Sequence, residues 1–198
     1  VASVNPIQHI QIGTIGIPMP STLCKVINDA GEELPLGEIG ELCIKGPQVM
    51  KGYWERPEAT AEIIDSEGWL KSGDIALIQP DGYMRIVDRK KDMILVSGFN
   101  VYPNELEDVM ASLPGVLQSA AIGIPDEKTG ELIKVFIVVK PGMTLTKEQV
   151  MAHMRANLTA YKAPKIIEFR ESLPTTNVGK ILRRELRDEE LKKLGLKK

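Results

Sequence analysis

The first half of the chain alternates short apolar runs with clusters of turn-forming residues. Apolar runs bounded by glycine, proline and acidic residues predict β-strands. They lie at residues 23–27, 41–45, 75–78 and 83–87. The turn sequence Pro80-Asp81-Gly82 joins the last two runs and predicts a hairpin. A helix is expected from Pro57, because proline followed by an acidic residue suits a first helical turn. Residues 15–88 therefore indicate a small β-rich unit.

The pattern changes after residue 88. Residues 89–92 are all charged, which is typical of a linker, and apolar residues then recur at helical spacing. These recurrent positions are Leu106, Val109, Met110 and Leu113, then Val150, Met154 and Leu158. The first of these helices is expected to begin at Pro103. Thr146 and Gln149 match a capping box, in which each side chain satisfies a free amide at the helix start.

Strand-like runs alternate with these helices. The runs lie at residues 116–124, 132–139 and 165–169, and a charged helix is expected over residues 183–194. Strands mixed with helices predict an α+β fold. We therefore divide the chain into a β-rich subdomain at residues 1–88, a linker at residues 89–92 and a compact mixed α/β domain at residues 93–198. Within the first part, residues 1–14 show no clear period, and the breaker-rich residues 15–20 predict a loop.

Composition narrows the classes of function. The 198 residues are 43% apolar and carry a net charge of −2, so a buried core is expected and bulk attraction to nucleic acid is not. Cys24 and Cys43 lie in apolar runs, which favours buried thiols. His9 and His153 cannot build a common zinc site, and no metal site is expected in this chain. No apolar run approaches the roughly 18 residues of a membrane span. Since the chain starts with Val1 and shows no signal peptide, we expect a piece of a longer cytoplasmic protein.

Two charged residues of the first half have the chemistry to contact a nucleotide. Ionised Asp74 only accepts hydrogen bonds, which suits the two vicinal hydroxyls of a ribose. Its alternative role is that of a turn or cap residue, since it follows a Ser-Gly turn. Arg89 carries a planar fork of donors that suits ribose oxygens or phosphate. It alternatively belongs to a solvated run of charges, although its position after an apolar strand allows the side chain to be aimed rigidly.

The second half adds a glycine turn and a lysine loop. Gly98 lies between an apolar strand and a helix start, where glycine lets the backbone approach a ligand closely. The alternative is a plain strand-to-helix turn. Lys180 follows residues 177–179 at an expected loop tip, and its ammonium is charged at neutral pH and can neutralise anions. The alternative is an exposed loop lysine.

In this order and spacing, these residues resemble the adenylate-forming superfamily, which includes acyl-CoA synthetases, firefly-type luciferases and the adenylation domains of peptide synthetases. The resemblance runs from about residue 15 to about residue 187 and is greatest to bacterial long-chain fatty acid–CoA ligases. It is carried by residues 45–54, 88–105 and 172–187. It implies that residues 1–88 are the distal subdomain of a large adenylation domain, that residues 89–92 are the hinge, and that residues 93–198 are the mobile C-terminal lid, which binds AMP.

The resemblance also implies a role for each matching residue. Asp74 and Arg89 would bind the nucleotide through its ribose, and Lys91 would be the hinge between the large and small domains. Lys180 would be the catalytic lysine that promotes adenylation. The loop that lines the CoA channel would fall at Gly98, Phe99 and Asn100.

The implied reaction has two halves. Fatty acid and ATP, with Mg²⁺, give acyl-adenylate and pyrophosphate, and the thiol of CoA then displaces AMP. The small domain swings about the hinge between the two halves. The family's phosphate loop, its adenine and magnesium motif and its acyl pocket are absent from this sequence. They are expected in a missing N-terminal domain of the same chain, so the fragment is expected to be inactive alone.

Two other functions stay open on the residues alone. One is a non-catalytic module that binds CoA or a partner, and the other is an adenylating enzyme whose acceptor is a carrier protein. The basic residues near the C-terminus allow a solvated helix end, which we favour, or contact with anionic lipid. They are Lys192, Lys193, Lys197 and Lys198. A cytoplasmic location with peripheral contact at the inner membrane follows from the resemblance.

Overall fold

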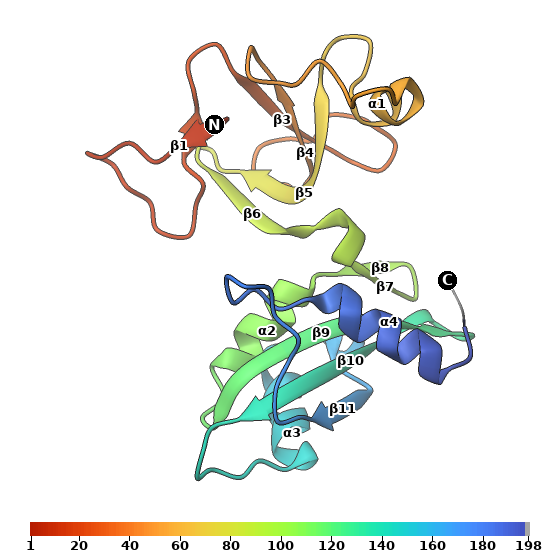
Figure 1. The fold of residues 1–198 in the computed structure, drawn as a ribbon. Coiled ribbons are helices and arrows are strands. Elements are labelled where there is room, and N and C mark those ends of the chain that lie inside the picture. The colour runs from red at the N-terminus through yellow and green to blue at the C-terminus, as the bar shows by residue number, and fades with distance from the viewer. Residues whose placement is uncertain (197–198) are drawn as a thin grey trace. The chain divides into compact units, whose positions relative to one another are not determined.

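The computed structural model describes residues 1–196, so the expectation for Lys197 and Lys198 lies outside the described residues. The chain forms two compact units, Val1–Lys91 and Asp92–Lys198 (Figure 1). The boundary falls inside the charged residues 89–92. The movement expected of that segment stays a prediction.

The first unit is built on an antiparallel sheet in the strand order β3-β4-β5-β6. These strands span Leu23–Ile27 (β3), Gly40–Lys45 (β4), Leu70–Ile78 (β5) and Met84–Arg89 (β6). Helix α1, Pro57–Ile63, begins at the expected proline and buries none of its residues. The hairpin between β5 and β6 is confirmed, because the N–H of Gly82 donates to the carbonyl of Gln79 over 2.9 Å in a tight turn.

Two short segments of this unit differ from expectation. Strand β1 (Ser3–Val4) pairs with β2 (Ile17–Pro18), where we expected irregular chain and a loop. A two-residue pairing rests on backbone hydrogen bonds and leaves no apolar period to detect. Arg89 is also the last residue of β6 and lies opposite Asp74 of β5, so the strand extends one residue into the predicted hinge.

The core of the first unit is small. Leu42, Ala76 and Met84 form its buried cluster. Both cysteines lie in the sheet as free thiols, Cys43 buried and Cys24 half-buried. Burial raises the pKa of both thiols, that of Cys43 to about 11, so both are protonated and unreactive at neutral pH.

The second unit contains a mixed sheet in which β10 is the central strand. Strand β10 (Gly130–Val139) pairs antiparallel with β9 (Val116–Asp126) and parallel with β11 (Ile166–Phe169). It also meets β7 (Ile94–Val96), which forms a hairpin with β8 (Phe99–Val101). These strands, together with three helices of the same unit, confirm the α+β fold.

Three α-helices and two short 3₁₀ turns complete the described part of this unit and its junction with the first. The helices are α2 (Pro103–Ala111), α3 (Lys147–Asn157) and α4 (Arg183–Lys193). The 3₁₀ turns are η1 (Lys90–Asp92), which spans the boundary between the units, and η2 (Ala160–Lys162). The expected capping box at Thr146 and Gln149 is present at the start of α3.

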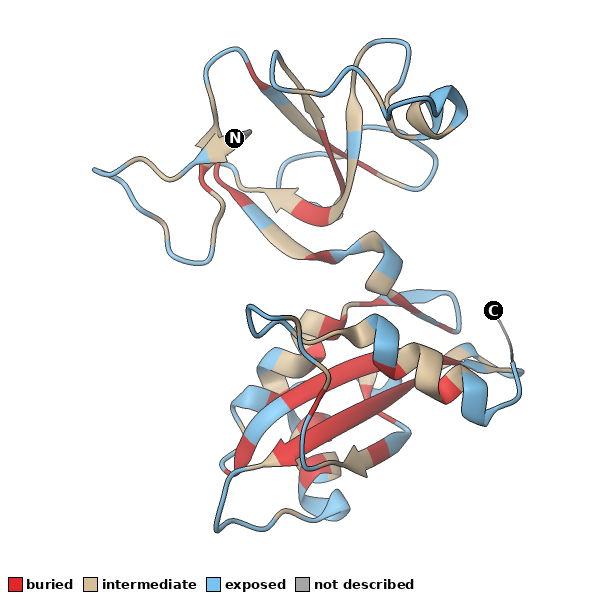
Figure 2. Ribbon diagram, in the orientation of Figure 1, coloured by how far each residue is buried: buried red, intermediate tan, exposed pale blue. Residues whose placement is uncertain are grey.

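Both faces of the sheet are covered, so buried residues gather along β9 and β10 (Figure 2). Alternate residues of a strand face opposite sides. Ile133, Val135 and Ile137 of β10 pack with α2 and α3 in one apolar cluster. Phe136 and Val138 pack with Leu186 of α4 in a second cluster on the other face. Helix α4 is therefore held to the sheet by a separate apolar layer.

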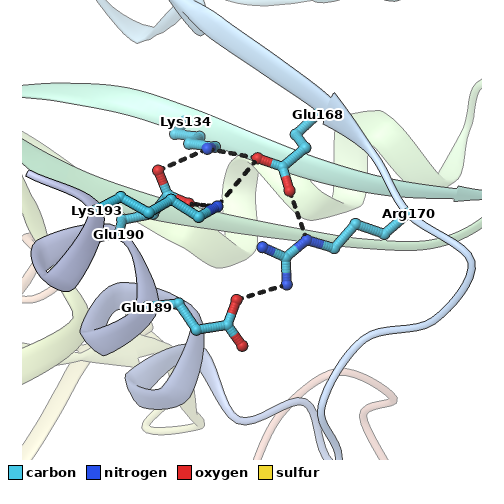
Figure 3. Close-up of polar contacts among 6 residues, drawn as sticks. All are labelled: Lys134, Glu168, Arg170, Glu189, Glu190 and Lys193. Carbon is cyan, nitrogen blue, oxygen red and sulfur yellow. Dashed lines mark hydrogen bonds and ion pairs between the residues drawn. The ribbon is translucent and has the colours of Figure 1, made fainter.

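A chain of charges holds the same helix in place (Figure 3). Lys134 of β10 lies on the α4 face, and only 6% of its side chain is exposed. Its Nζ lies 2.6 Å from a carboxylate oxygen of Glu168 in β11 and 2.6 Å from one of Glu190 in α4. Arg170 extends the chain by contacting Glu168 over 2.7 Å and Glu189 over 2.8 Å. Every charge in this partly buried cluster therefore has an opposite partner.

The pKa values of the carboxylates follow from these contacts. Burial alone would raise the pKa of Glu168, but hydrogen bonds from Lys134 and Arg170 outweigh it and lower the pKa from 4.5 to about 2. Burial would likewise raise the pKa of Glu190, but hydrogen bonds from Lys134 and Lys193 outweigh it, so this pKa is also lowered. Both groups are therefore ionised at neutral pH, and their charges favour the folded state.

Replacing Lys134 by methionine should lower the free energy of unfolding by about 3 kcal/mol, because the buried Glu190 and the partly buried Glu168 lose their shared cation. Lys140→Met, at an exposed position just after the same strand, should cost less than about 0.5 kcal/mol. Urea unfolding followed by far-ultraviolet circular dichroism measures both. The tryptophans, Trp54 and Trp69, both lie in the first unit, so their fluorescence transition should stay unchanged. Equal stability of the two variants would contradict this account.

The stability of the second unit should also fall in acid. Because the pKa of Glu168 is lower in the folded state, its contribution is complete above about pH 4.5 and is lost as the pH falls toward 2. The loss should be about 2 kcal/mol, allowing for partial screening at the exposed edge of the carboxylate. Glu168→Gln should flatten this acid limb, whereas the exposed control Glu127→Gln should leave it as it is. Unfolding midpoints measured from pH 6 to pH 2 test this for the unaltered chain and both variants. Parallel curves for all three proteins would show that Glu168 does not cause the loss of stability in acid.

Candidate functional site

The first unit brings two of the predicted site residues together. Asp74 and Arg89 lie opposite each other on neighbouring strands β5 and β6. The Nε of Arg89 lies 3.5 Å from Oδ1 of Asp74, and the side chains are 61% and 34% exposed respectively. The pair is long and open to solvent. It therefore presents a carboxylate and a guanidinium side by side, with lone pairs and N–H groups left for a ligand that carries hydroxyls.

The backbone beside Asp74 is held by a residue that the sequence did not single out. Asp74 lies within β5 rather than in the tight loop that Ser72-Gly73 indicated. Gly73 has a φ of +74°, a conformation that favours glycine, and its N–H donates to Oε1 of Glu41 over 3.3 Å. Glu41 is 7% exposed and lies on the adjacent strand β4. Nothing in the sequence indicated this contact, because Glu41 is a single acidic residue beside an apolar run.

The same Glu41 reaches the residue after Arg89. Its Oε2 accepts a hydrogen bond of 2.9 Å from Nζ of Lys90, and this contact raises the pKa of Lys90. The exposed carboxylate of Asp29 also lies 3.4 Å from the same ammonium. Lys91 follows with an exposed side chain, for which residues 1–196 provide no hydrogen bond or ion pair. Lys90 is thus fastened to the first unit and Lys91 is not.

In the second unit, Gly98 occupies the tip of a β-hairpin. We expected a turn from a strand into a helix, but β8 follows first and α2 begins only at Pro103. Ser97 and Gly98 have φ values of +51° and +83° and form a two-residue loop, because Val96 pairs with Phe99. Two successive residues with positive φ are typical of a type I′ hairpin turn. A three-residue strand was too short to give a period.

The exposed side of this hairpin carries an aromatic pair. Phe99 is 57% exposed, and its ring centroid lies 4.9 Å from that of Tyr161 in η2. Asn100 is exposed beside it. Lys162, the residue after Tyr161, places its Nζ 2.6 Å and 2.7 Å from the two carboxylate oxygens of Glu105 in α2. Tyr161 was not singled out from the sequence, since its partner lies far away along the chain.

Lys180 lies on a tight surface turn, as expected. The N–H of Thr176 donates to the carbonyl of Lys180 over 2.8 Å, and the N–H of Gly179 donates to the carbonyl of Thr176 over 2.9 Å. The N–H of Lys180 itself donates to the hydroxyl of Thr176. Its side chain is exposed and has no ionic partner within the described part of the chain. The turn therefore offers an uncommitted ammonium on a well-bonded backbone.

Arg183 begins α4 close after this turn and joins it to the rest of the unit. Its Nε donates to Glu107 over 2.8 Å, and its Nη2 donates to Glu107 and to Asn104 over 2.5 Å each. Its Nη1 lies 3.6 Å from Asp92. Both Glu107 and Asn104 belong to α2, the helix that follows the Gly98 hairpin. Arg183 was missed in the sequence because it resembles the neighbouring surface arginines.

The described residues show neither a metal centre nor a membrane span. Within residues 1–196, no three His, Cys, Asp or Glu side chains are grouped so that they could hold a metal ion. None of the helices in that range is both long and apolar enough to cross a bilayer.

Two family models match the chain. Residues 1–54 match the AMP-binding enzyme model, and residues 105–180 match the model of the AMP-binding enzyme C-terminal domain. The second match includes Lys180. The residues between the two matches contain Asp74, Arg89, Lys91 and the Gly98 hairpin.

Curated relatives and solved structures resemble the chain over most of its length. It is 58% identical to a long-chain-fatty-acid–CoA ligase of Escherichia coli O6:H1 and 59% identical to one of Yersinia pestis, over 96% and 91% of this chain. It covers 34% and 32% of those proteins, so it spans about a third of the curated relatives it matches. The crystal structure of ATP-bound MatB from Rhodopseudomonas palustris superposes with a TM-score of 0.88 at 35% identity, covering 98% of this chain and 38% of that one.

The open Asp74–Arg89 pair should contribute little to folding. Asp74→Asn and Arg89→Gln should each change the free energy of unfolding by less than about 1 kcal/mol, because exposed ion pairs are well screened. Glu41→Gln is the matched comparison and should cost about 1–3 kcal/mol, since it weakens two hydrogen bonds to a buried carboxylate. Tryptophan fluorescence during urea unfolding reports on this unit. A cost at Asp74 as large as that at Glu41 would show that the pair is structural.

Proposed function

Because the chain belongs to the AMP-binding enzymes, we propose that it is the C-terminal third of a long-chain fatty acid–CoA ligase. The full-length enzyme would join a fatty acid to CoA with conversion of ATP to AMP and pyrophosphate. The observation that carries the proposal is the 58% identity to the Escherichia coli ligase over 96% of this chain. In this proposal residues 1–88 belong to a large adenylation domain, residues 89–92 are the hinge, and residues 93–198 are the lid.

Asp74 and Arg89 would hold the ribose of the nucleotide. A ribose presents two adjacent hydroxyls, and an ionised carboxylate accepts hydrogen bonds from both. The guanidinium of Arg89 donates from the same side, since the two side chains lie 3.5 Å apart. Their exposure supports the proposal, because neither group is already saturated by protein partners. Both lie on the rigid framework of a sheet, so the ribose would be positioned and not merely bound.

Lys180 would act in the first half-reaction. The fatty acid carboxylate must attack the α-phosphate of ATP, and both are anions. An ammonium placed between them offsets their repulsion and stabilises the charge that develops on the phosphoryl oxygens. The exposed side chain of Lys180 on a hydrogen-bonded turn supports this role. ATP and fatty acid are substrates here, and the lysine performs no covalent chemistry.

The hairpin with Gly98, Phe99 and Asn100 would act in the second half-reaction, when the thiol of CoA displaces AMP. A narrow tip with two positive φ angles exposes backbone to a ligand, and Phe99 adds an apolar wall that suits the pantetheine arm. Rotation about Lys91 would exchange the Lys180 turn for this hairpin between the two half-reactions. Lys91 lies at the boundary of two compact units, and its exposed side chain has no ionic partner in residues 1–196, which supports the hinge role.

Magnesium and the remaining partners belong to the full-length enzyme. Mg²⁺ would accompany the phosphates of ATP and be held by residues of the N-terminal domain of the full-length enzyme. The N-terminal domain of the same chain would supply the acyl pocket. We place the enzyme in the cytoplasm with peripheral contact at the inner membrane, because its acyl substrate partitions into lipid.

Lys180→Ala in the full-length ligase should lower the rate of acyl-adenylate formation by at least about 100-fold, which is typical for loss of one charge-stabilising group. Thioester formation from supplied acyl-adenylate and CoA should stay within about twofold, since that step does not use the lysine. Lys192→Ala, at an exposed position on α4, is the control and should leave both rates unchanged. Pyrophosphate release and thioester yield measure the two steps. Equal losses in both half-reactions would contradict the proposed division of roles.

The 198-residue chain alone should form no oleoyl-CoA from oleate, ATP and CoA. Detection of ATP-dependent product by chromatography would show that the chain is sufficient for catalysis.

A further inference from the structure

The residues on either side of Lys91 are each fastened to a different unit. Lys90 contacts the buried Glu41 over 2.9 Å and so belongs to the first unit. Asp92 contacts Arg183 over 3.6 Å and so belongs to the second. The 3₁₀ turn η1 contains all three residues, and only the central one presents a side chain without an ionic partner in residues 1–196.

The anchor on the first side is firm because Glu41 is itself fixed. Only 8% of its side chain is exposed, and its other carboxylate oxygen accepts the N–H of Gly73. Lys90 is therefore held against a strand of the central sheet. The contact also raises the pKa of Lys90, so the ammonium keeps its charge across the neutral range.

The anchor on the second side depends on the shape of Arg183. Its side chain is 19% exposed, and Nε and Nη2 are committed to Glu107 and Asn104 of α2. Glu107 is fixed in turn, since its Oε1 accepts the backbone N–H of Ala121 in β9 over 2.9 Å. This arrangement aims Nη1 toward Asp92. Lysine cannot reproduce it, because a single ammonium lacks the planar fork.

We propose that Glu41 and Arg183 are positioning residues that confine the pivot of the chain to Lys91. With both neighbours anchored, a rotation about Lys91 carries each unit as a rigid body. Without either anchor the rotation spreads over several residues, and the end point of the movement scatters. A displacement of about 1 Å at a reacting group can cost about 100-fold in rate, so loss of either anchor should slow catalysis. This catalytic consequence rests on the proposed function.

Backbone amide exchange measured residue by residue on the 198-residue chain tests the pivot without any assay of activity. Within residues 87–95 of the unaltered chain, fast exchange should be limited to the amides next to Lys91. Glu41→Gln should speed exchange at residues 89–90 by at least about tenfold, and Arg183→Gln should do so at residues 92–94, since each removes one local anchor. Each variant should leave the other side unchanged.

The controls are neighbours that make no such contact. Glu38→Gln is exposed near the start of β4, and Arg184→Gln replaces a side chain that is 82% exposed. Both should exchange like the unaltered chain. Lys90→Gln and Asp92→Asn remove the same two contacts by replacing the other partner of each pair. They take the place of Glu41→Gln or Arg183→Gln if either of these variants fails to fold. Unchanged exchange on both sides of Lys91, or a uniform rise that includes the amides of β4 and β9, would overturn the proposal.

The full-length ligase separates this inference from the proposed function. Arg183→Gln should lower both half-reactions while the KM for ATP stays the same, because positioning is lost and the ribose contacts are kept. If exchange spreads as expected but no form of the full-length protein makes acyl-CoA, the pivot stands and the ligase proposal fails. If the ligase is active and exchange does not change, the ligase proposal stands and the pivot fails.

Discussion

The paired burial of Lys134 is the interaction on which the second unit depends. An unpaired ammonium at this depth would cost several kcal/mol, and Glu168 and Glu190 remove that cost by coming from two different elements. The lysine thereby joins the central strand, an edge strand and α4. Helix α4 carries Arg183 at its first position and follows the Lys180 turn directly. The charge cluster around Glu190, toward the end of α4, therefore helps to fix the position of the proposed catalytic turn at Lys180, just before the start of this helix.

The two units differ in the size of the apolar core that supports their exposed polar residues. The first has a small apolar core and relies on an antiparallel sheet with a buried carboxylate, Glu41, beside the proposed ribose-binding residues. The second fills both faces of its sheet and can bury whole charge pairs. In each unit the groups proposed for chemistry are more exposed than the residues that orient them, Glu41 and Arg183. This separation leaves the exposed groups free for substrates.

Local signals in the sequence were reliable where the cause was local. The proline at residue 57, the capping box at Thr146 and the Pro-Asp-Gly turn each act within a few residues, and each was correctly interpreted. Strand β8 was missed because three residues after a glycine turn leave no period. Glu41 and Arg183 were missed because their partners lie 49 and 76 residues away, and no spacing rule reports such contacts. The roles of Asp74, Arg89 and Lys180 came from the family resemblance, since their residue types alone left ordinary alternatives open.

The boundary between Lys91 and Asp92 also has a consequence for how such proteins diversify. Each hydrophobic cluster described above is made entirely of residues from one side of this peptide bond. A chimera that joined the front of one relative to the back of another at this point would receive every core whole from a single parent. Recombination here would exchange the second unit between relatives while sparing the packing of both halves.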